Sequence, residues 1–492
     1  MKKSFTCFTA AALALSLLAG LPVRAQAESS AVYEAEAARL SGSNQIVEDS
    51  DASRGRAVGR FADDDSGLVF QISVPRDGYY DLAFTMKGIG GGKANLVCVD
   101  GAPAGEISCK GEEYSTPVLL KTPLSAGSHE ISLKKEQGWI LLDRLEVTET
   151  TGIPKSVYDV KPQLINPNAT PETQRLYRFL RDCFGRYTLS GQFCHGGIDG
   201  EEMQAVYSVT GKYPAILGLD MRDYTPSRTY YGGDCHEVEY AVAYHELGGI
   251  VSFCWHWNAP PNTMNMGTND KGNPYWWKGS RTGSSTFNIR RILLDEDPEG
   301  KEVVDHDIRA VAEQLKRLEE KHVPVLWRPL HEASNGWFWW GACGADCYKQ
   351  FWIYLYKQLT EKYECNNLIW VWNGQDPEWY PGDEYVDIIG EDIYVQPRQY
   401  CAHIGKFAEL TGYPGTPKII ALTENGVLPD IDACAENGAL WSWFCTWEYE
   451  YVVKDGQYSP EYTDADTLYK IYHHPKVLTL DELAGLRREQ KG

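Results

Sequence analysis

The sequence predicts an α/β protein in which a (β/α)8 barrel follows a smaller all-β sandwich of the jelly-roll type. Residues 32–148 alternate short strand-like segments with turns rich in Gly, Asp and Ser, and no long helical pattern interrupts them. After Pro171 the pattern changes to apolar strands alternating with amphipathic helices. The length of 492 residues accommodates one barrel and one such module, and 43% hydrophobic with 23% charged residues is typical of globular domains.

Residues 28–150 are expected to form the β-sandwich. Its strand candidates share β-favouring side chains and turn residues at their ends: Gly67–Val74, Gly78–Met86, Ala94–Val99, His129–Lys134 and Trp139–Val147. A linker is expected over residues 151–171, because this segment contains four prolines and little periodicity.

The catalytic barrel is expected over residues 172–478. The predicted helices are Pro171–Phe184, Glu201–Thr210, Val238–Leu247, Asp305–Lys321 and Asp346–Tyr363. Eight apolar segments read as strands buried on both faces: Leu189–Phe193, Ala215–Asp220, Ile250–Trp257, Val323–His331, Asn367–Asn373, Asp387–Tyr394, Lys418–Glu424 and Ala439–Trp447. Eight βα repeats over about 300 residues fit a TIM barrel.

The N-terminus predicts export. Residues 1–27 have a basic start, a short apolar segment and a small-x-small pattern at Ala25–Ala27, as in a signal peptide, so the protein is expected to be secreted, periplasmic or on the cell surface. The apolar segment is too short to span a bilayer comfortably. Twelve cysteines follow it, which permits disulfides without defining their pairing; Cys98 with Cys109 and Cys343 with Cys347 are candidates by spacing.

The net charge of −21 argues against nucleic acid as a partner, because such a surface repels phosphates. We expect no membrane span and a monomer. The sequence contains no GxSxG nucleophile elbow and no P-loop, and its histidines lack the spacing of zinc hydrolases. No cofactor is therefore expected for catalysis.

Polar residues terminate most of the predicted barrel strands, at the end where active sites of this fold lie. These residues are Asp220, His256, His331, Glu332, Asn373, Asp392, Tyr394, Glu424 and Trp447. An unpaired carboxylate is expensive to bury, so Glu332 and Glu424 require an explanation. One is structural, with each Glu paired to an arginine such as Arg328. The other is catalytic, since two facing carboxyls are the apparatus of glycoside hydrolysis.

The supply of aromatic side chains favours the catalytic explanation. All sixteen tryptophans except Trp139 lie between Trp255 and Trp447, many of them beside strand ends. Indole faces stack on sugar rings, and polar groups at the rim bind the hydroxyls. Trp327 and Trp370 are expected in the core, whereas Trp337 lies in a predicted loop and suits sugar stacking.

Three segments of the barrel resemble glycoside hydrolase family 26. The sequence WRPLHE at residues 327–332, followed by NGWFWWG at 335–341, resembles the acid/base segment of that family, including the His before the Glu. The sequence IIALTENG at 419–426 resembles its nucleophile strand, and FCWHWN at 253–258 its third strand. The resemblance covers residues 171–475 and implies Glu332 as acid/base and Glu424 as nucleophile.

The same resemblance implies roles for the other site residues. His256 and Trp337 would bind sugar near the cleavage point, and His331 would orient Glu332 or contact substrate. Tyr394 would hydrogen-bond the nucleophile, and Trp447 would form the floor beneath the reacting sugar, with Trp441 and Trp443 as rivals on the same strand. The family retains anomeric configuration, which requires carboxyls about 5–5.5 Å apart, a protonated Glu332 and an ionised Glu424.

The N-terminal region resembles carbohydrate-binding module family 35. Its opening segment YEAEA at 33–37 and its last strand WILLDRL at 139–145 carry the resemblance. Glu34 and Glu36 would lie on one face of a strand and, with Asp143, would hold a structural calcium ion. The alternative is a solvated acidic edge. Trp139 would form the sugar platform, or else belong to the core.

These observations predict a secreted retaining endo-β-1,4-mannanase acting on mannan, galactomannan or glucomannan polysaccharides and manno-oligosaccharides. A β-1,3-1,4-glucanase, a β-1,3-xylanase or a mannobiose-releasing exo-enzyme on the same scaffold remain alternatives. A glycan-binding protein without turnover is the alternative outside the enzyme class, and it conflicts with the retention of both glutamates.

Overall fold

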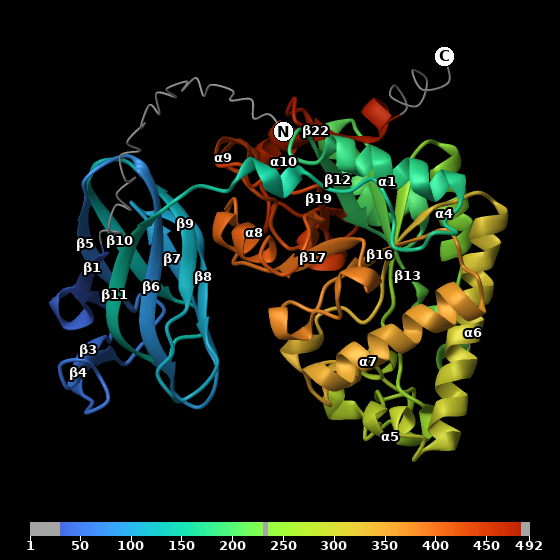
Figure 1. Cartoon of the computed structure of the whole chain (residues 1–492), viewed down its shortest axis with the longest axis horizontal. Helices are drawn as coiled ribbons and strands as arrows, with labels where there is room; N and C mark the ends of the chain where they lie inside the picture. The colour runs from blue at the N-terminus through green and yellow to red at the C-terminus, as the bar shows by residue number, and fades with distance from the viewer. Residues whose placement is uncertain (1–29, 230–234, 484–492) are drawn as a thin grey trace, which may run out of the picture.

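The computed structural model describes residues 30–229 and 235–483, and the predicted signal peptide, residues 1–27, lies outside them. A β-sandwich lies beside an α/β barrel, so the predicted fold class is confirmed (Figure 1). In the described part of the chain, no helix has the length and apolarity needed to cross a membrane. Among the described residues, none of the twelve cysteines forms a disulfide, including both pairs suggested by spacing.

Two antiparallel sheets form the N-terminal module. One has the order β3-β4-β11-β6-β9 with β1 paired to β11, and the other has the order β2-β5-β10-β7-β8. The strands are β1 (Ser30–Glu34), β2 (Arg39–Ser41), β3 (Gln45–Glu48), β4 (Arg56–Gly59), β5 (Gly67–Val74), β6 (Gly78–Gly88), β7 (Lys93–Val99), β8 (Ala102–Cys109), β9 (Val118–Leu124), β10 (Gly127–Lys135) and β11 (Ile140–Thr150). Alternate residues such as Phe70 and Phe84 point inward and form the core between the sheets.

Five strands of the module were not predicted from the sequence: the short strands β2, β3 and β4, and the longer β8 and β9. Pro103 and Gly105 in β8 and Pro123 in β9 weaken the strand signal. Both strands lie at the edge of their sheets, where a proline can be accommodated because one side of the strand has no partner.

Eight parallel strands form the barrel in chain order, and β12 closes it by pairing with both β13 and β19. They are β12 (Thr188–Phe193), β13 (Ile216–Asp220), β14 (Ile250–Cys254), β15 (Val325–Arg328), β16 (Leu368–Trp372), β17 (Ile388–Ile393), β18 (Ile419–Asn425) and β19 (Trp443–Thr446). Each of the eight overlaps a predicted strand. Strands β14 and β15 end three residues earlier than predicted, so His256 and Glu332 lie in the loops that follow.

Helices surround the barrel and pack their apolar faces on it. They are α1 (Pro171–Cys183), α2 (Glu201–Thr210), α3 (Pro226–Thr229), α4 (Glu237–Glu246), α5 (Ile289–Leu293), α6 (Pro298–Glu320), α7 (Ala345–Tyr356), α8 (Ile404–Leu410), α9 (Ile431–Glu436) and α10 (Ala465–Tyr472). Helix α7 continues as a π-helix over Lys357–Lys362. Two short strand pairings complete the fold. Strand β20 (Val453–Lys454) pairs with β21 (Gln457–Tyr458), and β22 (Val477–Leu478) pairs with β12.

The module lies against the side of the barrel formed by α8 (Figure 1). Helix α8 packs on β9 and β8, and Gly405 permits the close approach because a Cβ there would lie 3.0 Å from Leu119 and 3.1 Å from the Leu120 backbone. Lys110 of the module forms an ion pair with Asp376 of the barrel at 2.7 Å. These contacts fix the module beside the carboxyl ends of β15 to β17.

Candidate active site

The carboxyl ends of the barrel strands surround a pocket of about 330 Å³. All seven barrel residues that the sequence predicted for the site line it: His256, His331, Glu332, Trp337, Tyr394, Glu424 and Trp447. Arg281, Phe338, Tyr449, Glu450 and Tyr451 also line it. The pocket therefore combines two carboxyls with aromatic walls, as a sugar site requires.

Glu424, near the end of β18, is a buried carboxylate held by two donors. The Tyr394 hydroxyl donates to its Oε2 at 2.6 Å, and the Arg328 guanidinium contacts its Oε1. Arg328 thus makes the structural pairing that the sequence left open. The pairing does not exclude catalysis, because both donors favour the ionised carboxylate that a nucleophile needs.

Glu332 follows β15 in an uncommon backbone conformation. Its φ of 52° lies in the left-handed region, which non-glycine residues adopt rarely and often at functional sites. Its amide donates to the Asn373 carbonyl at 2.7 Å, which fixes this turn. The Trp337 indole N–H donates to its Oε2 at 2.8 Å and orients the carboxyl in the pocket.

The two glutamates lie close together and differ in their surroundings. One carboxyl oxygen from each of Glu332, Asp392 and Glu424 lies within 4.8 Å of the other two. Burial raises the pKa of Glu332 well above its usual value, and the charges of Asp392 and Glu424 add to this rise. Burial also raises the pKa of Glu424, but Arg328 opposes the rise and makes it smaller. Of the two carboxyls, Glu332 therefore has the stronger tendency to hold a proton.

A buried network supports Glu424 from below. Asp392 accepts hydrogen bonds from Arg328 at 2.9 Å, Asn373 at 2.8 Å and Thr423 at 2.7 Å. The sequence placed Asn373 and Asp392 at strand ends but gave no role to Asp392 or Thr423. The signal was present in the polar ends of β16 to β18, but which groups meet depends on the closure of the barrel.

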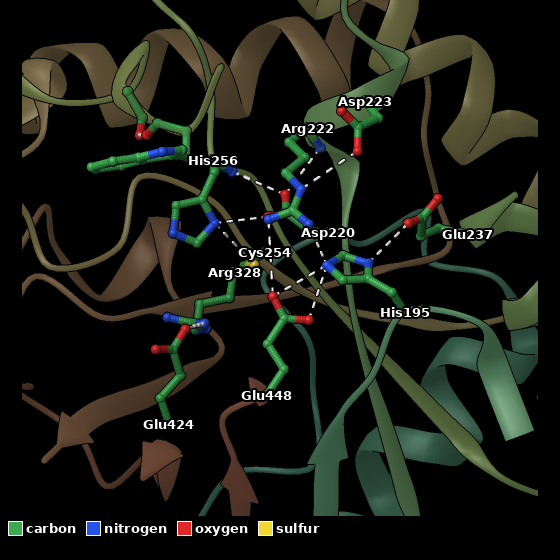
Figure 2. A network of polar contacts seen from close by, with 12 residues as sticks. His195, Asp220, Arg222, Asp223, Glu237, Cys254, His256, Arg328, Glu424 and Glu448 are labelled. Atoms are coloured by element: carbon green, nitrogen blue, oxygen red, sulfur yellow. Dashed lines mark hydrogen bonds and ion pairs between the residues drawn. The ribbon is translucent and has the colours of Figure 1, made fainter. Parts of the chain in front are cut away.

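His256 is held by a carboxylate beneath the pocket. Its Nδ1 lies 2.7 Å from Oδ2 of Asp220, and its amide donates to Oδ1 at 3.0 Å (Figure 2). Burial tends to raise the pKa of Asp220, but the adjacent His256 holds this pKa below its usual value. Asp220 is therefore a carboxylate that fixes the ring of His256, so that the other ring nitrogen is free to face a sugar.

Behind Asp220, the network continues into a buried ion cluster (Figure 2). Arg222 lies within 3.7 Å of Asp220 and 4.0 Å of Glu448, and His195 lies between Glu448 at 2.9 Å and Glu237 at 3.2 Å. Burial lowers the pKa of His195, but hydrogen bonds to Glu237 and Glu448 raise it to about 9. The sequence analysis assigned no role to His195 or Arg222.

The remaining pocket residues supply apolar surfaces. His331 is fully buried, and burial together with the charge of Arg328 lowers its pKa, so its ring is neutral. It packs edge-on against His256 at 4.7 Å. Trp447 lines the pocket and contacts Phe193, whereas its rivals Trp441 and Trp443 are buried in the core. Trp327 and Trp370 are in the core as predicted.

The module carboxylates differ from their predicted arrangement. Strand β1 ends at Glu34, and Glu36 lies in a 3-10 turn over Ala35–Ala37, so the two side chains do not share the face of one strand. They are not a solvated acidic edge either, since the side chains of Glu34, Glu36 and Asp143 are only 13%, 7% and 2% exposed. The Ser53 hydroxyl donates to Glu34 at 2.9 Å and to Asp143 at 2.8 Å.

Glu36 is the feature that fits a cation. Both of its carboxylate oxygens are buried without a hydrogen-bond partner, and Arg56 approaches only to 3.8 Å. Oxygen ligands of this kind suit calcium. Trp139, the other predicted site residue of the module, precedes β11 with its side chain 49% exposed, outside the core.

A closed (β/α)8 barrel with two buried carboxyls facing each other in an aromatic pocket defines a glycoside hydrolase. The chain belongs to glycosyl hydrolase family 26, which it matches over residues 165–482, and its residues 31–150 match the carbohydrate-binding module family 35. Both resemblances found in the sequence are thereby confirmed.

Similar proteins support this assignment over most of the chain. A mannan endo-1,4-beta-mannosidase of Thermothelomyces thermophilus is 35% identical over 94% of this chain and 92% of its own. The crystal structure of the Podospora anserina GH26-CBM35 beta-(1,4)-mannanase is 36% identical, with a TM-score of 0.61 over 93% of this chain and 99% of that one. A ruminal GH26 endo-beta-1,4-mannanase is 28% identical, with a TM-score of 0.63 over 90% and 99%.

Proposed function

We propose that this glycoside hydrolase is a retaining endo-β-1,4-mannanase that acts on mannan, galactomannan or glucomannan. The observation that carries the proposal is the approach of Glu332 and Glu424 within 4.8 Å in the pocket. Such proximity leaves no room for the water that inverting enzymes place between their carboxyls. The substrate is inferred from relatives of the same two-domain architecture, which are mannanases.

In the first step, Glu424 attacks the anomeric carbon while Glu332 donates its proton to the departing glycosidic oxygen. A glycosyl-enzyme ester forms, and the leaving chain departs with the proton from Glu332. In the second step, Glu332 takes a proton from water, and the resulting hydroxide displaces Glu424. Tyr394 and Arg328 stabilise Glu424 whenever it carries its charge.

The other pocket residues would bind the sugars on either side of the cleaved bond. His256, oriented by Asp220, presents a ring nitrogen to the hydroxyls of the reacting sugar, beside the buried ring of His331. Trp447 offers an apolar surface beneath that sugar, and the exposed face of Trp337 stacks on the next one.

The module would hold the enzyme on its polysaccharide, with Trp139 as a stacking platform, and so raise the local concentration of barrel and substrate. Glu34, Glu36 and Asp143 would hold a structural calcium ion in it, which would stabilise the fold and take no part in the chemistry. Among the described residues, these three carboxylates are not one of the groups whose possible ligand atoms lie within 4.8 Å of one another. The predicted signal peptide supports export from the cell.

The test is the release of reducing ends from mannan, galactomannan, mixed-linkage glucan and β-1,3-xylan by the wild-type protein and by Glu424→Ala. We expect activity on the mannans, loss in the variant by about three orders of magnitude, and a first product that retains its anomeric configuration in NMR spectra. Activity on glucan or xylan would overturn the specificity. Binding of mannan without hydrolysis would overturn the enzymatic role.

A further inference from the structure

A second and larger cavity lies between the module and the barrel. It has a volume of about 760 Å³, within the range of ligand sites, and Glu332, Trp337 and Tyr394 line both it and the catalytic pocket. Glu424, His256 and Trp447 line the catalytic pocket alone. The interdomain groove is thus continuous with the active site on the side of the catalytic acid.

The module forms one wall of this groove with the outer face of β8. Side chains alternate along a strand, so Ser108 and Lys110 are exposed and line the groove, whereas Ile107 and Cys109 are buried in the module core. Ile107 also borders the groove. Leu120 of β9 extends the same wall. This wall therefore presents the Ser108 hydroxyl, the apolar Leu120 and the Lys110 ammonium group, which is paired with Asp376 of the barrel.

The barrel supplies the other lining residues, which combine the amides of Asn335 and Gln375 with the charged side chains of Asp376, Glu391, Lys406 and Glu409. Asn335 and Gln375 line the groove, and their side-chain amides are bonded to each other at 2.6 Å. Gln375 also donates to the Asp392 carbonyl at 2.9 Å, which connects this side of the groove to the network beneath the glutamates. Amide, hydroxyl and carboxylate groups that line one groove can hydrogen-bond the hydroxyls of a neutral sugar chain.

The reaction determines in which direction the polysaccharide runs through the cleft. Glu332 protonates the oxygen that leaves, so the leaving sugars lie on its side of the pair. We propose that the interdomain groove binds the leaving-group part of a neutral β-linked polysaccharide, and that Ser108 and Lys110 of the module contribute directly to the active-site cleft. This inference rests on the proposed function. The module is then part of the catalytic cleft as well as a tether.

The test compares Ser108→Trp with the wild-type full chain on two substrates. Mannohexaose reaches across both sides of the cleaved bond, whereas an aryl β-mannobioside has sugars only on the Glu424 side. Because the indole would fill the groove, we expect kcat/KM on mannohexaose to fall roughly tenfold, the value of one or two hydrogen bonds, with no change beyond about twofold on the aryl substrate. Ser128→Trp, at an exposed position of β10 outside the groove, is the matched control.

A second measurement separates binding in the groove from a disturbed fold. With mannohexaose labelled at its reducing end, Ser108→Trp should move the preferred cleavage toward that end, because fewer sugars fit beyond Glu332. Ser108→Ala should give a smaller shift in the same direction. An unchanged kcat/KM and cleavage pattern in Ser108→Trp would overturn the inference. Failure of the wild type to cleave either substrate would instead overturn the proposed function.

Discussion

The barrel and the module each bury a group of three acidic side chains, but they compensate the charges differently. In the barrel, Arg328 lies between Glu424 and Asp392, and further donors leave Asp392 fully hydrogen-bonded. In the module, Glu34, Glu36 and Asp143 each have their own arginine within 4.0 Å, but the oxygens of Glu36 receive no hydrogen bond. The comparison teaches that burial alone does not define the chemistry of a carboxyl group. A protein cation beside one of two carboxyls lowers the pKa of that carboxyl relative to the other. Carboxylate oxygens without hydrogen-bond donors instead suit a bound metal ion.

The largest effect is expected from a substitution of Glu332 in the barrel site. Glu332→Ala should lower kcat/KM on mannan by about 10³-fold, because the leaving oxygen loses its proton donor. An aryl mannobioside with an acidic phenol should lose much less, since that leaving group departs without a proton. Steady-state kinetics on both substrates measure the difference. Glu450→Ala, which removes an exposed carboxylate of the same pocket, is the control and should stay within a fewfold of wild type.

The next effect concerns the arginine between the carboxylates. Arg328→Met should destabilise the barrel by about 3–5 kcal/mol, because two buried carboxylates lose their cation. Since Arg328 lowers the pKa of Glu424, its removal should raise that pKa and shift the acid limb of the pH–rate profile to higher pH. Urea unfolding and the pH dependence of kcat/KM measure the two effects. An acid limb at the wild-type pH would contradict this account of Glu424.

The module side of the comparison predicts a metal effect on stability. Saturating calcium should raise the Tm of the module by roughly 10 °C, as expected for about 2–3 kcal/mol of ligand stabilisation in a domain of this size. Chelation should remove the gain, and Glu36→Gln should abolish it. Calorimetry with and without calcium measures the shift. The control Glu332→Gln should keep it, and a shift that survives in Glu36→Gln would place the ion elsewhere.

The smallest expected effect tests the assignment of Glu332 as the general acid. The Trp337 indole N–H donates to Glu332 and lowers its pKa, against the larger effect of burial. Trp337→Phe should therefore raise this pKa and move the alkaline limb of the pH–rate profile to higher pH, with less than about a tenfold change in kcat. A limb that moves to lower pH would contradict the hydrogen bond as the cause.

The sequence predicted the parts of the site that local pattern controls. A parallel strand buried on both faces reads as an apolar run, and its polar terminus then marks the end where chemistry occurs. Glu332, Glu424 and Tyr394 were found in this way. Strand ends were less certain, because the apolar pattern continues past the last ladder hydrogen bond at Cys254 and Arg328. The strands β8 and β9 were missed because prolines at sheet edges obscure the pattern.

The sequence by itself therefore determined the two-domain architecture and the family, and it predicted Glu332 and Glu424 as the catalytic pair. Only the tertiary structure decided which neighbours set the chemistry: Asp220 beneath His256, Arg328 between Glu424 and Asp392, and the turn that separates Glu36 from β1. It also decided that β8 of the module forms a wall beside Glu332. The physical reason is that these contacts join residues far apart in the chain, and barrel closure and domain packing, which no local periodicity encodes, bring them together.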